Sequence, residues 1–332
     1  MQHSSYIPHL ISPRRYAQIS DSMSTTVKAP ALRPGDTVRI IAPASAPDMN
    51  NLSKGISKLR NWGYKISLGR NIRKLVQRNS LAAPDIDRAE ELMNAFTDDS
   101  VKAIFCARGG YGSIHTLPLL DYDVIRDHPK IFVGYSDITA LHLALSKFSN
   151  LITFHGPMPG SDPDEIRKPS FRNFADILSG QSTDLSGYLD KVIKYIISGK
   201  VEGVSQGTNI SVAASLVGTE YMPSADGKIL FMEDTGVTSG DIDRYLFTMK
   251  LAGLLDKYVG FVFGDFRAIT EAEEPMPFIE DVVQLYLNQL KVPSLYGLPF
   301  GHGDDQMLIP LNAKIRLSTE DTYLELLENV VD

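Results

Sequence analysis

The chain has few features that would place it in a thiol-rich, membrane-spanning or nucleic-acid-binding class. A single cysteine, Cys106, excludes an internal disulfide and any metal site built from several thiolates. No apolar stretch reaches the roughly 18 residues of a membrane-spanning helix. The formal net charge is −7, and no cluster of Lys and Arg is longer than a triplet. We therefore expect neither nucleic acid nor an anionic membrane as a partner.

The N-terminal segment also lacks the pattern of a secretory signal. Arg14 and Arg15 are not followed by an apolar run. We interpret residues 1–28 as a disordered N-terminal extension and expect a cytoplasmic protein. Cys106 ends the apolar run 101–105, which predicts a buried structural thiol.

Apolar runs alternate with amphipathic segments through the first half of the chain. The predicted strands are Thr37–Ala42, Tyr64–Leu68, Val101–Cys106, Ile131–Gly134 and Leu151–Phe154. The predicted helices are Leu52–Trp62, Asp85–Phe96, Ser113–Leu120 and Ile138–Phe148. This alternation predicts an α/β domain with a flavodoxin-like or Rossmann-like parallel sheet and helices on both faces. Its ligand site is expected at the carboxyl ends of the strands.

The second half of the chain has a different organisation. Residues 159–168 are rich in Pro and Asp and mark a boundary. We divide the chain into an N-terminal domain at 29–160, a linker and connecting segment at 161–205 and a smaller C-terminal α+β domain at 206–332. The elements predicted beyond the boundary are helices near 171–178, 209–217, 241–254 and 278–290, and strands near 191–197, 200–204, 228–232, 258–263 and the C-terminus.

The segment around Ser136 carries the strongest catalytic signal. An apolar β-branched run leads into Gly134-Tyr135-Ser136, and apolar positions at helical spacing follow from Ile138. A sharp strand-to-helix turn of this kind can expose a nucleophilic serine hydroxyl. The same pattern also fits an ordinary helix with a serine N-cap and Asp137 in its first turn. Taken alone, the pattern leaves both interpretations open.

A glycine-rich turn, Gly109-Gly110-Tyr111-Gly112, follows the third predicted strand. Glycines at a strand end let the backbone approach a ligand closely and direct N–H groups into a site. Neither a P-loop nor a well-placed G-x-G-x-x-G is present, so the signal for nucleotide binding is weak. With a nearby serine nucleophile, a glycine N–H and the Asp137 N–H could form an oxyanion hole.

A serine nucleophile requires a base and a group that orients the base. His155 directly follows a predicted strand, and His302 lies between two glycines. Spacing alone does not choose between them. Glu233 is the first polar residue after the buried run 229–232, which favours it as the orienting carboxylate. A helix cap or a salt-bridge partner is an equally good interpretation of that position.

Several motifs together identify a family. They are Ala42–Ser45, Ala107–Gly112, Gly134–Thr139, His155–Met158, Gly207–Asn209, Gly227–Asp234, Asp243-Arg244 and Gly297–His302. In these motifs, which run in order from about residue 33 to the end, the chain resembles the LD-carboxypeptidase family of serine peptidases. That family also contains the microcin C immunity proteins. Thr208 departs from the pattern, because many members have a second glycine there.

The resemblance implies a catalytic role for three residues in two domains. Ser136 corresponds to the nucleophile, Glu233 to the triad carboxylate and His302 to the base, so the active site is expected at the domain interface. The implied oxyanion donors are the N–H groups of Asp137 and Gly110. The substrate carboxylate would be bound by Arg108, Arg244 or main-chain N–H groups. No metal and no cofactor are expected, and we expect a homodimer.

The activity implied by the resemblance is hydrolysis of an LD-peptide bond. The substrate would be a small peptide, a muropeptide tetrapeptide that loses its C-terminal D-alanine during cytoplasmic peptidoglycan recycling. A microcin C immunity-type peptidase acting on a peptidyl nucleotide is the alternative within the family. An esterase of the α/β-hydrolase type would normally show G-x-S-x-G, whereas residue 138 is Ile. A non-catalytic binding protein would be expected to lack a triad member, and all three are present.

Overall fold

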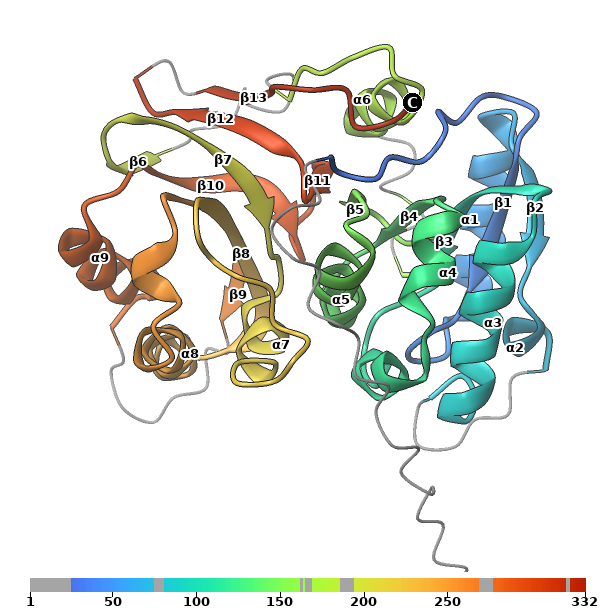
Figure 1. The fold of residues 1–332 in the computed structure, drawn as a ribbon, viewed down its shortest axis with the longest axis horizontal. Coiled ribbons are helices and arrows are strands. Elements are labelled where there is room, and N and C mark those ends of the chain that lie inside the picture. The colour runs from blue at the N-terminus through green and yellow to red at the C-terminus, as the bar shows by residue number, and fades with distance from the viewer. Residues whose placement is uncertain are drawn as a thin grey trace, which may run out of the picture.

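Two β-sheets form the framework of the protein, seen here in a computed structural model. The structure describes residues 25–74, 81–161, 164, 169–185, 194–268, 277–320 and 323–332. The first sheet has the strand order β11-β5-β4-β3-β1-β2, and the second has the order β13-β12-β7-β8-β9-β10-β6. The two sheets lie side by side, and α5 runs between them (Figure 1). The mixed α/β class predicted from the sequence is confirmed.

The elements have the following bounds. The strands are β1 (Thr37–Ile41), β2 (Lys65–Leu68), β3 (Val101–Cys106), β4 (Ile131–Gly134), β5 (Thr153–His155), β6 (Lys194–Ile197), β7 (Lys200–Gln206), β8 (Lys228–Val237), β9 (Gly260–Ala268), β10 (Ser294–Gly301), β11 (Ile309–Leu311), β12 (Lys314–Ser318) and β13 (Tyr323–Leu326). The helices are α1 (Met49–Asn61), α2 (Arg70–Lys74), α3 (Asp85–Thr97), α4 (Tyr122–Asp127), α5 (Thr139–Ser149), α6 (Pro169–Leu178), α7 (Ile210–Ser215), α8 (Ser239–Leu251) and α9 (Ile279–Leu290).

The first sheet is parallel from β1 to β5, as the alternation of strands and helices predicts. Its central strands β3 and β4 are buried almost throughout because helices cover both faces. Ile104 packs with residues of α3, α4 and α5, whereas Phe105 packs on the opposite face with residues of α1 and α6. The carboxyl ends of β3, β4 and β5 therefore meet at one edge of a well-supported sheet.

The sheet edge beside β5 is completed by a strand from the far end of the chain. β11 pairs antiparallel to β5, with Ile309 opposite His155. β6 and β7 lie in the second sheet, although they fall in the predicted connecting segment 161–205. The division into domains stays a proposal, and the strand pairing argues for placing β6 and β7 in the second unit.

Residues 1–24 of the predicted N-terminal extension lie outside the described residues, but residues 25–28 do not. Val27 forms a parallel bridge with Leu151. Its N–H donates to the Asn150 carbonyl at 2.9 Å, and its own carbonyl accepts from the Ile152 N–H at 2.9 Å. These four residues are therefore part of the fold, and the predicted extension reaches too far along the chain.

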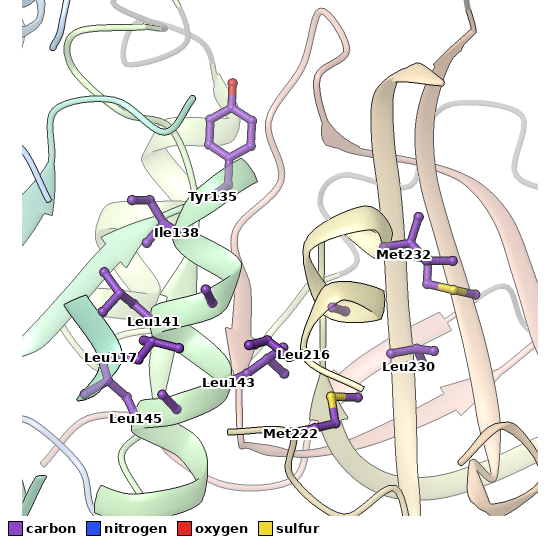
Figure 2. Packing of buried hydrophobic residues seen from close by; sticks show 14 of the residues in the cluster. Leu117, Tyr135, Ile138, Leu141, Leu143, Leu145, Leu216, Met222, Leu230 and Met232 are labelled. Atoms are coloured by element: carbon purple, nitrogen blue, oxygen red, sulfur yellow. The ribbon is translucent and has the colours of Figure 1, made fainter. Parts of the chain in front are cut away.

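The second sheet is mixed. The pairs β7–β8, β8–β9 and β9–β10 are parallel, whereas β12, β13 and β6 pair antiparallel with their neighbours. Apolar side chains join the two halves of the molecule. Leu143 on α5 points toward Leu216, which follows α7, and Met222 lies beside them (Figure 2).

Some predicted elements differ from the observed ones. Residues 113–119 form a 3₁₀ helix rather than an α-helix, and Pro118 within it lacks the N–H that an α-helical ladder uses. α2 and α4 are short and were not predicted. β8 continues past Met232 to Val237, because residues 234–237 pair with β9. Glu233 therefore lies within a strand rather than beyond its end.

Candidate active site

Ser136 occupies a strained turn at the carboxyl end of β4. Its φ is +62°, a left-handed conformation that is rare for residues other than glycine. The turn is tight, since a Cβ atom on Gly134 would lie 2.9 Å from Cγ2 of Ile138. Helix α5 begins three residues after Ser136. The local geometry is that of a nucleophile elbow, in which strain serves to expose a side chain.

The second sheet brings a histidine and a carboxylate to Ser136. His302 directly follows β10, and Glu233 lies in β8. The His302 Nε2 atom lies 3.2 Å from the Ser136 Oγ atom. The His302 Nδ1 atom lies 2.7 Å from Oε2 of Glu233. Side chains from both sheets thus form one continuous hydrogen-bonded chain.

Glu233 is fully buried, in an environment that suits a carboxylate whose role is to orient His302. Burial raises the pKa of Glu233 above its usual value, and the hydrogen bonds from His302 and Asn209 oppose that rise. The Asn209 Nδ2 atom donates to Oε1 of Glu233 at 3.3 Å. When Nδ1–H of His302 donates to Glu233, Nε2 is left to accept the proton of the Ser136 hydroxyl. This arrangement can activate a serine for nucleophilic attack.

The glycine-rich turn after β3 lies against the serine. A Cβ atom on Gly109 would lie 3.0 Å from the Ser136 Cβ atom and 3.3 Å from the Asp137 backbone nitrogen. Ser45 holds the turn, because its N–H donates to the Gly109 carbonyl and its Oγ accepts from the Tyr111 N–H, each at 3.1 Å. Gly110 has φ +90°, which favours glycine. Two predicted oxyanion donors, Asp137 and Gly110, therefore belong to neighbouring turns.

The Asp137 side chain has a structural use. Its Oδ2 accepts from the Ser113 N–H at 2.8 Å, and the Ser113 hydroxyl donates to the Asp137 carbonyl at 2.6 Å. These bonds tie the turn that carries the serine to the 3₁₀ helix after the glycine turn. The side chain of Asp137 therefore holds the turn, while its backbone nitrogen lies close to Gly109.

The structure places His302, and not His155, at Ser136. His155 is fully buried, and its Nδ1 lies 2.7 Å from Oγ1 of Thr208. The Tyr135 ring contacts both histidines, with centroid distances of 5.3 Å to His155 and 5.0 Å to His302. Tyr135 therefore packs against both rings, and His302 is the one whose Nε2 contacts the Ser136 hydroxyl.

The two candidate carboxylate-binding arginines have different surroundings. Arg108 is exposed next to the glycine turn, and its Nη1 donates to the Ala46 carbonyl at 3.1 Å. Arg244 lies on α8, where its Nη1 pairs with Oδ1 of Asp241 at 2.9 Å. Its side chain is 70% exposed. The position of Arg108 beside Gly109 and Gly110 favours it over Arg244.

Cys106 is buried, as predicted, at the end of β3. Burial raises the pKa of the Cys106 thiol well above its usual value, so the reactive thiolate is disfavoured. Within the described ranges, no group of three or more His, Cys, Asp or Glu side chains could hold a metal ion. In the same part of the chain, no helix is long and apolar enough to cross a bilayer.

Two supporting residues were not singled out from the sequence. Arg88 on α3 is fully buried and donates to the carbonyls of Pro43 and Gly112, so it ties the loop after β1 to the last residue of the glycine turn. Asn209 bridges two buried carboxylates, donating to Asp234 at 3.0 Å as well as to Glu233. The Gly207–Asn209 motif could have pointed to Asn209 as a functional residue. No sequence motif pointed to Arg88.

Comparisons with known proteins show which family the chain is similar to. Residues 38–156 match the family model described as the LD-carboxypeptidase N-terminal domain, and residues 202–317 match the LD-carboxypeptidase C-terminal domain. A probable murein peptide carboxypeptidase of Bacillus subtilis (strain 168) is 35% identical over 303 residues, which cover 90% of this chain and 93% of the relative.

Two solved structures share the fold over nearly the whole chain. One is the microcin C7 self immunity protein MccF in complex with aspartyl sulfamoyl adenosine, with a TM-score of 0.80, 25% identity and coverage of 92% of this chain and 99% of that chain. The other is a muramoyltetrapeptide carboxypeptidase from Oxalobacter formigenes, with a TM-score of 0.73, 26% identity and coverage of 87% and 97%.

Proposed function

Because the chain belongs to the LD-carboxypeptidase family, we propose that it is a serine carboxypeptidase with a Ser136-His302-Glu233 triad. The observation that carries the proposal is the hydrogen-bonded chain from Ser136 through His302 to Glu233, at 3.2 Å and 2.7 Å. Nucleophile, base and orienting carboxylate are within hydrogen-bond reach, in the order that acyl transfer requires.

In the proposed reaction, His302 takes the Ser136 proton as the hydroxyl oxygen attacks the carbonyl carbon of the scissile peptide bond. Glu233 keeps Nδ1 of His302 protonated and stabilises the imidazolium that forms. The imidazolium then gives its proton to the leaving amine, which departs as the C–N bond breaks. Water, deprotonated by His302, hydrolyses the acyl-enzyme and restores the Ser136 hydroxyl.

The tetrahedral oxyanion needs donors that are already in place. The N–H groups of Asp137 and Gly110 are the proposed donors, supported by the approach of the glycine turn to Ser136 and Asp137. Removing one such donor typically lowers kcat by about 10²- to 10³-fold in serine peptidases. Ser45 and Arg88, which hold the turn through hydrogen bonds, would keep the donors aligned.

We propose a muropeptide tetrapeptide as the substrate, cleaved to release its C-terminal D-alanine. The names of the Bacillus subtilis relative and the Oxalobacter formigenes enzyme support this substrate class. Arg108, exposed beside the glycine turn, is the preferred group for binding the free carboxylate, with Arg244 as the second candidate. A cytoplasmic role in peptidoglycan recycling and a homodimeric state belong to the same proposal.

A peptidyl or aminoacyl nucleotide is the second candidate substrate. It is favoured by the similarity to MccF, whose structure was solved with aspartyl sulfamoyl adenosine. Both substrates would use the same triad, because each presents an acyl carbonyl carbon to the Ser136 hydroxyl. An esterase is less favoured, since Ile138 stands where the G-x-S-x-G pattern has glycine.

Incubation with defined substrates tests the proposal. The purified protein would be mixed with a muropeptide tetrapeptide and, separately, with a peptidyl nucleotide, and the products would be read by mass spectrometry. Release of D-alanine from the tetrapeptide is the expected result, with Ser136→Ala as the blank. Cleavage of the nucleotide conjugate alone would keep the mechanism and assign the chain to immunity-type peptidases. Cleavage of neither substrate by the folded protein would refute the proposed substrates.

A further inference from the structure

His155 contacts a neighbour of each residue in the proposed triad, although it takes no part in the proton transfer. Its ring packs against Tyr135, which precedes Ser136, with 5.3 Å between centroids. It also packs against Phe300, two residues before His302, with 5.6 Å between centroids. The third contact is the hydrogen bond to Thr208, whose carbonyl accepts the Glu233 N–H at 3.2 Å.

The bond between His155 and Thr208 crosses from one sheet to the other. His155 ends β5 in the sheet that carries Ser136, whereas Thr208 follows β7 in the sheet that carries Glu233. The exposed fractions are 0% for His155 and 1% for Thr208, so water does not compete for the bond. Breaking this buried hydrogen bond would leave both His155 Nδ1 and the Thr208 hydroxyl unsatisfied. The cost of that loss favours one fixed arrangement of the two residues.

The polar surroundings of His155 are sparse. Its Nε2 atom is buried and has no hydrogen-bond partner among the described residues. The ring therefore makes its polar contact through Nδ1. Burial holds the pKa of His155 well below its usual value, and the imidazole is neutral. A neutral, buried ring anchored in this way is suited to holding geometry and not to exchanging protons with solvent.

The segment that Thr208 belongs to supports Glu233 directly. Glu233 is held at its backbone by Thr208 and at its carboxylate by Asn209, whose Nδ2 donates to Oε1. A second bond ties this segment to the first sheet, since the Asn209 N–H donates to Oγ1 of Thr139 on α5 at 3.1 Å. Residues 207–209 thus connect the carboxylate to the half of the molecule that carries the nucleophile.

We propose that His155 is a positioning residue whose hydrogen bond to Thr208 holds Glu233 in register with Ser136 across the two sheets. The inference rests on the proposed serine mechanism and deepens it. Without the bond, residues 207–209 keep the Asn209 bond to Thr139, but Glu233 and the His302 ring that it holds can shift relative to Ser136. A displacement of about 1 Å in a catalytic group can cost on the order of 100-fold in rate.

The test compares two buried Thr–His hydrogen bonds. Thr208→Val removes the hydroxyl that joins the sheets. Thr153→Val removes the hydroxyl that contacts Nδ1 of His142 at 2.8 Å, a bond that stays within the first sheet and its helix α5. Both substitutions replace a hydroxyl by a methyl group at a fully buried site, so their folding penalties are comparable.

The main readout is the rate at which a fluorophosphonate labels Ser136, because that rate depends on the triad and not on the peptide substrate. Thr208→Val is expected to slow labelling and to lower kcat by about 10- to 100-fold, with KM changed by less than about threefold. Thr208→Ser is expected to restore most of the rate, since it restores the hydroxyl. Thr153→Val is expected to lower Tm while labelling stays within about twofold of wild type.

A second pair of variants covers the case in which Thr208→Val does not fold. His155→Asn can place an amide near the position of Nδ1, whereas His155→Leu cannot make the bond. Faster labelling of the Asn variant supports the inference. Equal labelling rates in this pair, or a folded Thr208→Val protein with the wild-type rate, would overturn it.

The proposed function and this inference fail in different ways. A folded wild-type protein that is not labelled at Ser136 refutes the serine mechanism, and the inference falls with it. A wild-type protein that is labelled but leaves the tetrapeptide intact refutes only the proposed substrate. In that case the labelling rates of the variants still decide the role of His155.

Discussion

Gly301 lies against Glu233 with no room for a side chain. A Cβ atom on Gly301 would lie 2.6 Å from Oε2 of Glu233, the oxygen that Nδ1 of His302 contacts. The φ of Gly301 is +105°, which other residues rarely adopt. His302 reaches the buried carboxylate because the residue before it is glycine.

Gly301→Ala should therefore lower activity by more than its loss of folding stability can account for. The added methyl group displaces Glu233 or the strand that carries His302, and we expect kcat to fall by about 100-fold or more. Gly236→Ala is a matched control, because Gly236 has φ +68° and a Cβ atom there would meet no described residue within 4 Å apart from its chain neighbours. Equal activities of the two variants, measured with the tetrapeptide, would contradict this explanation.

The triad assignment predicts large and similar losses for its members. Ser136→Ala and His302→Ala should each lower turnover by roughly 10⁴-fold or more, because triad residues act as a unit. Glu233→Gln should also be severe, since it removes the charge that stabilises the imidazolium. His128→Ala serves as the control for losses during purification, and circular dichroism checks that each variant is folded. Near-normal activity of His302→Ala would disprove the choice of base.

The buried histidines predict a loss of stability in mild acid. Burial lowers the pKa of His142 to about 4 from 6.5, and the hydrogen bond with the Gly134 carbonyl opposes that shift only in part. Between these two pH values the unfolded chain binds the proton more readily than the folded chain, so stability falls as pH decreases through this window. The full difference corresponds to about 3 kcal/mol for His142.

Thermal unfolding at pH 7 and pH 4.5 measures this effect. We expect a lower Tm at pH 4.5, with burial of His155 contributing in the same direction. In His142→Asn the Tm difference between the two pH values should shrink, whereas His128→Ala should retain it. A Tm that rises toward pH 4.5 would contradict the assignment of neutral buried histidines.

The environment of Cys106 predicts insensitivity to thiol reagents. The thiol is fully buried and its pKa is raised, so alkylating agents should leave the activity of the native protein unchanged. Labelling should appear only after denaturation, as intact-mass measurement can show. Metal chelators should also have no effect on turnover, because the proposed mechanism uses no metal. Inhibition by a chelator alone would indicate metal-dependent chemistry.

The proposed carboxypeptidase activity predicts a strong preference for a free C-terminus. Amidation of the tetrapeptide should cost about 2–5 kcal/mol of transition-state stabilisation, because the group that binds the carboxylate would be left unpaired. Arg108→Met should reduce that preference, whereas Arg244→Met, on the exposed face of α8, should change it little. Equal cleavage of amidated and free peptides would favour an endopeptidase or an amidase.

Local patterns in the sequence determined the five parallel strands of the first sheet and the place where the chain turns at Ser136. An apolar β-branched run followed by Gly-x-Ser predicts a strand and a turn into a helix through contacts between near neighbours, whereas the left-handed φ that distinguishes the elbow from a serine N-cap was found in the structure. The choice of His302 over His155 was different. Residue spacing left it open, and the resemblance to a family favoured His302.

Only the tertiary structure decided how the distant parts meet. Three contacts join residues that are far apart in the chain. They are the pairing of β11 with β5, the pairing with β9 that extends β8 past Glu233, and the bond between His155 and Thr208. Such contacts depend on strand order and on how the two sheets pack, and no local spacing encodes them. The sequence determined which side chains are available as nucleophile, base and carboxylate. Packing between the two sheets determined which histidine reaches the serine.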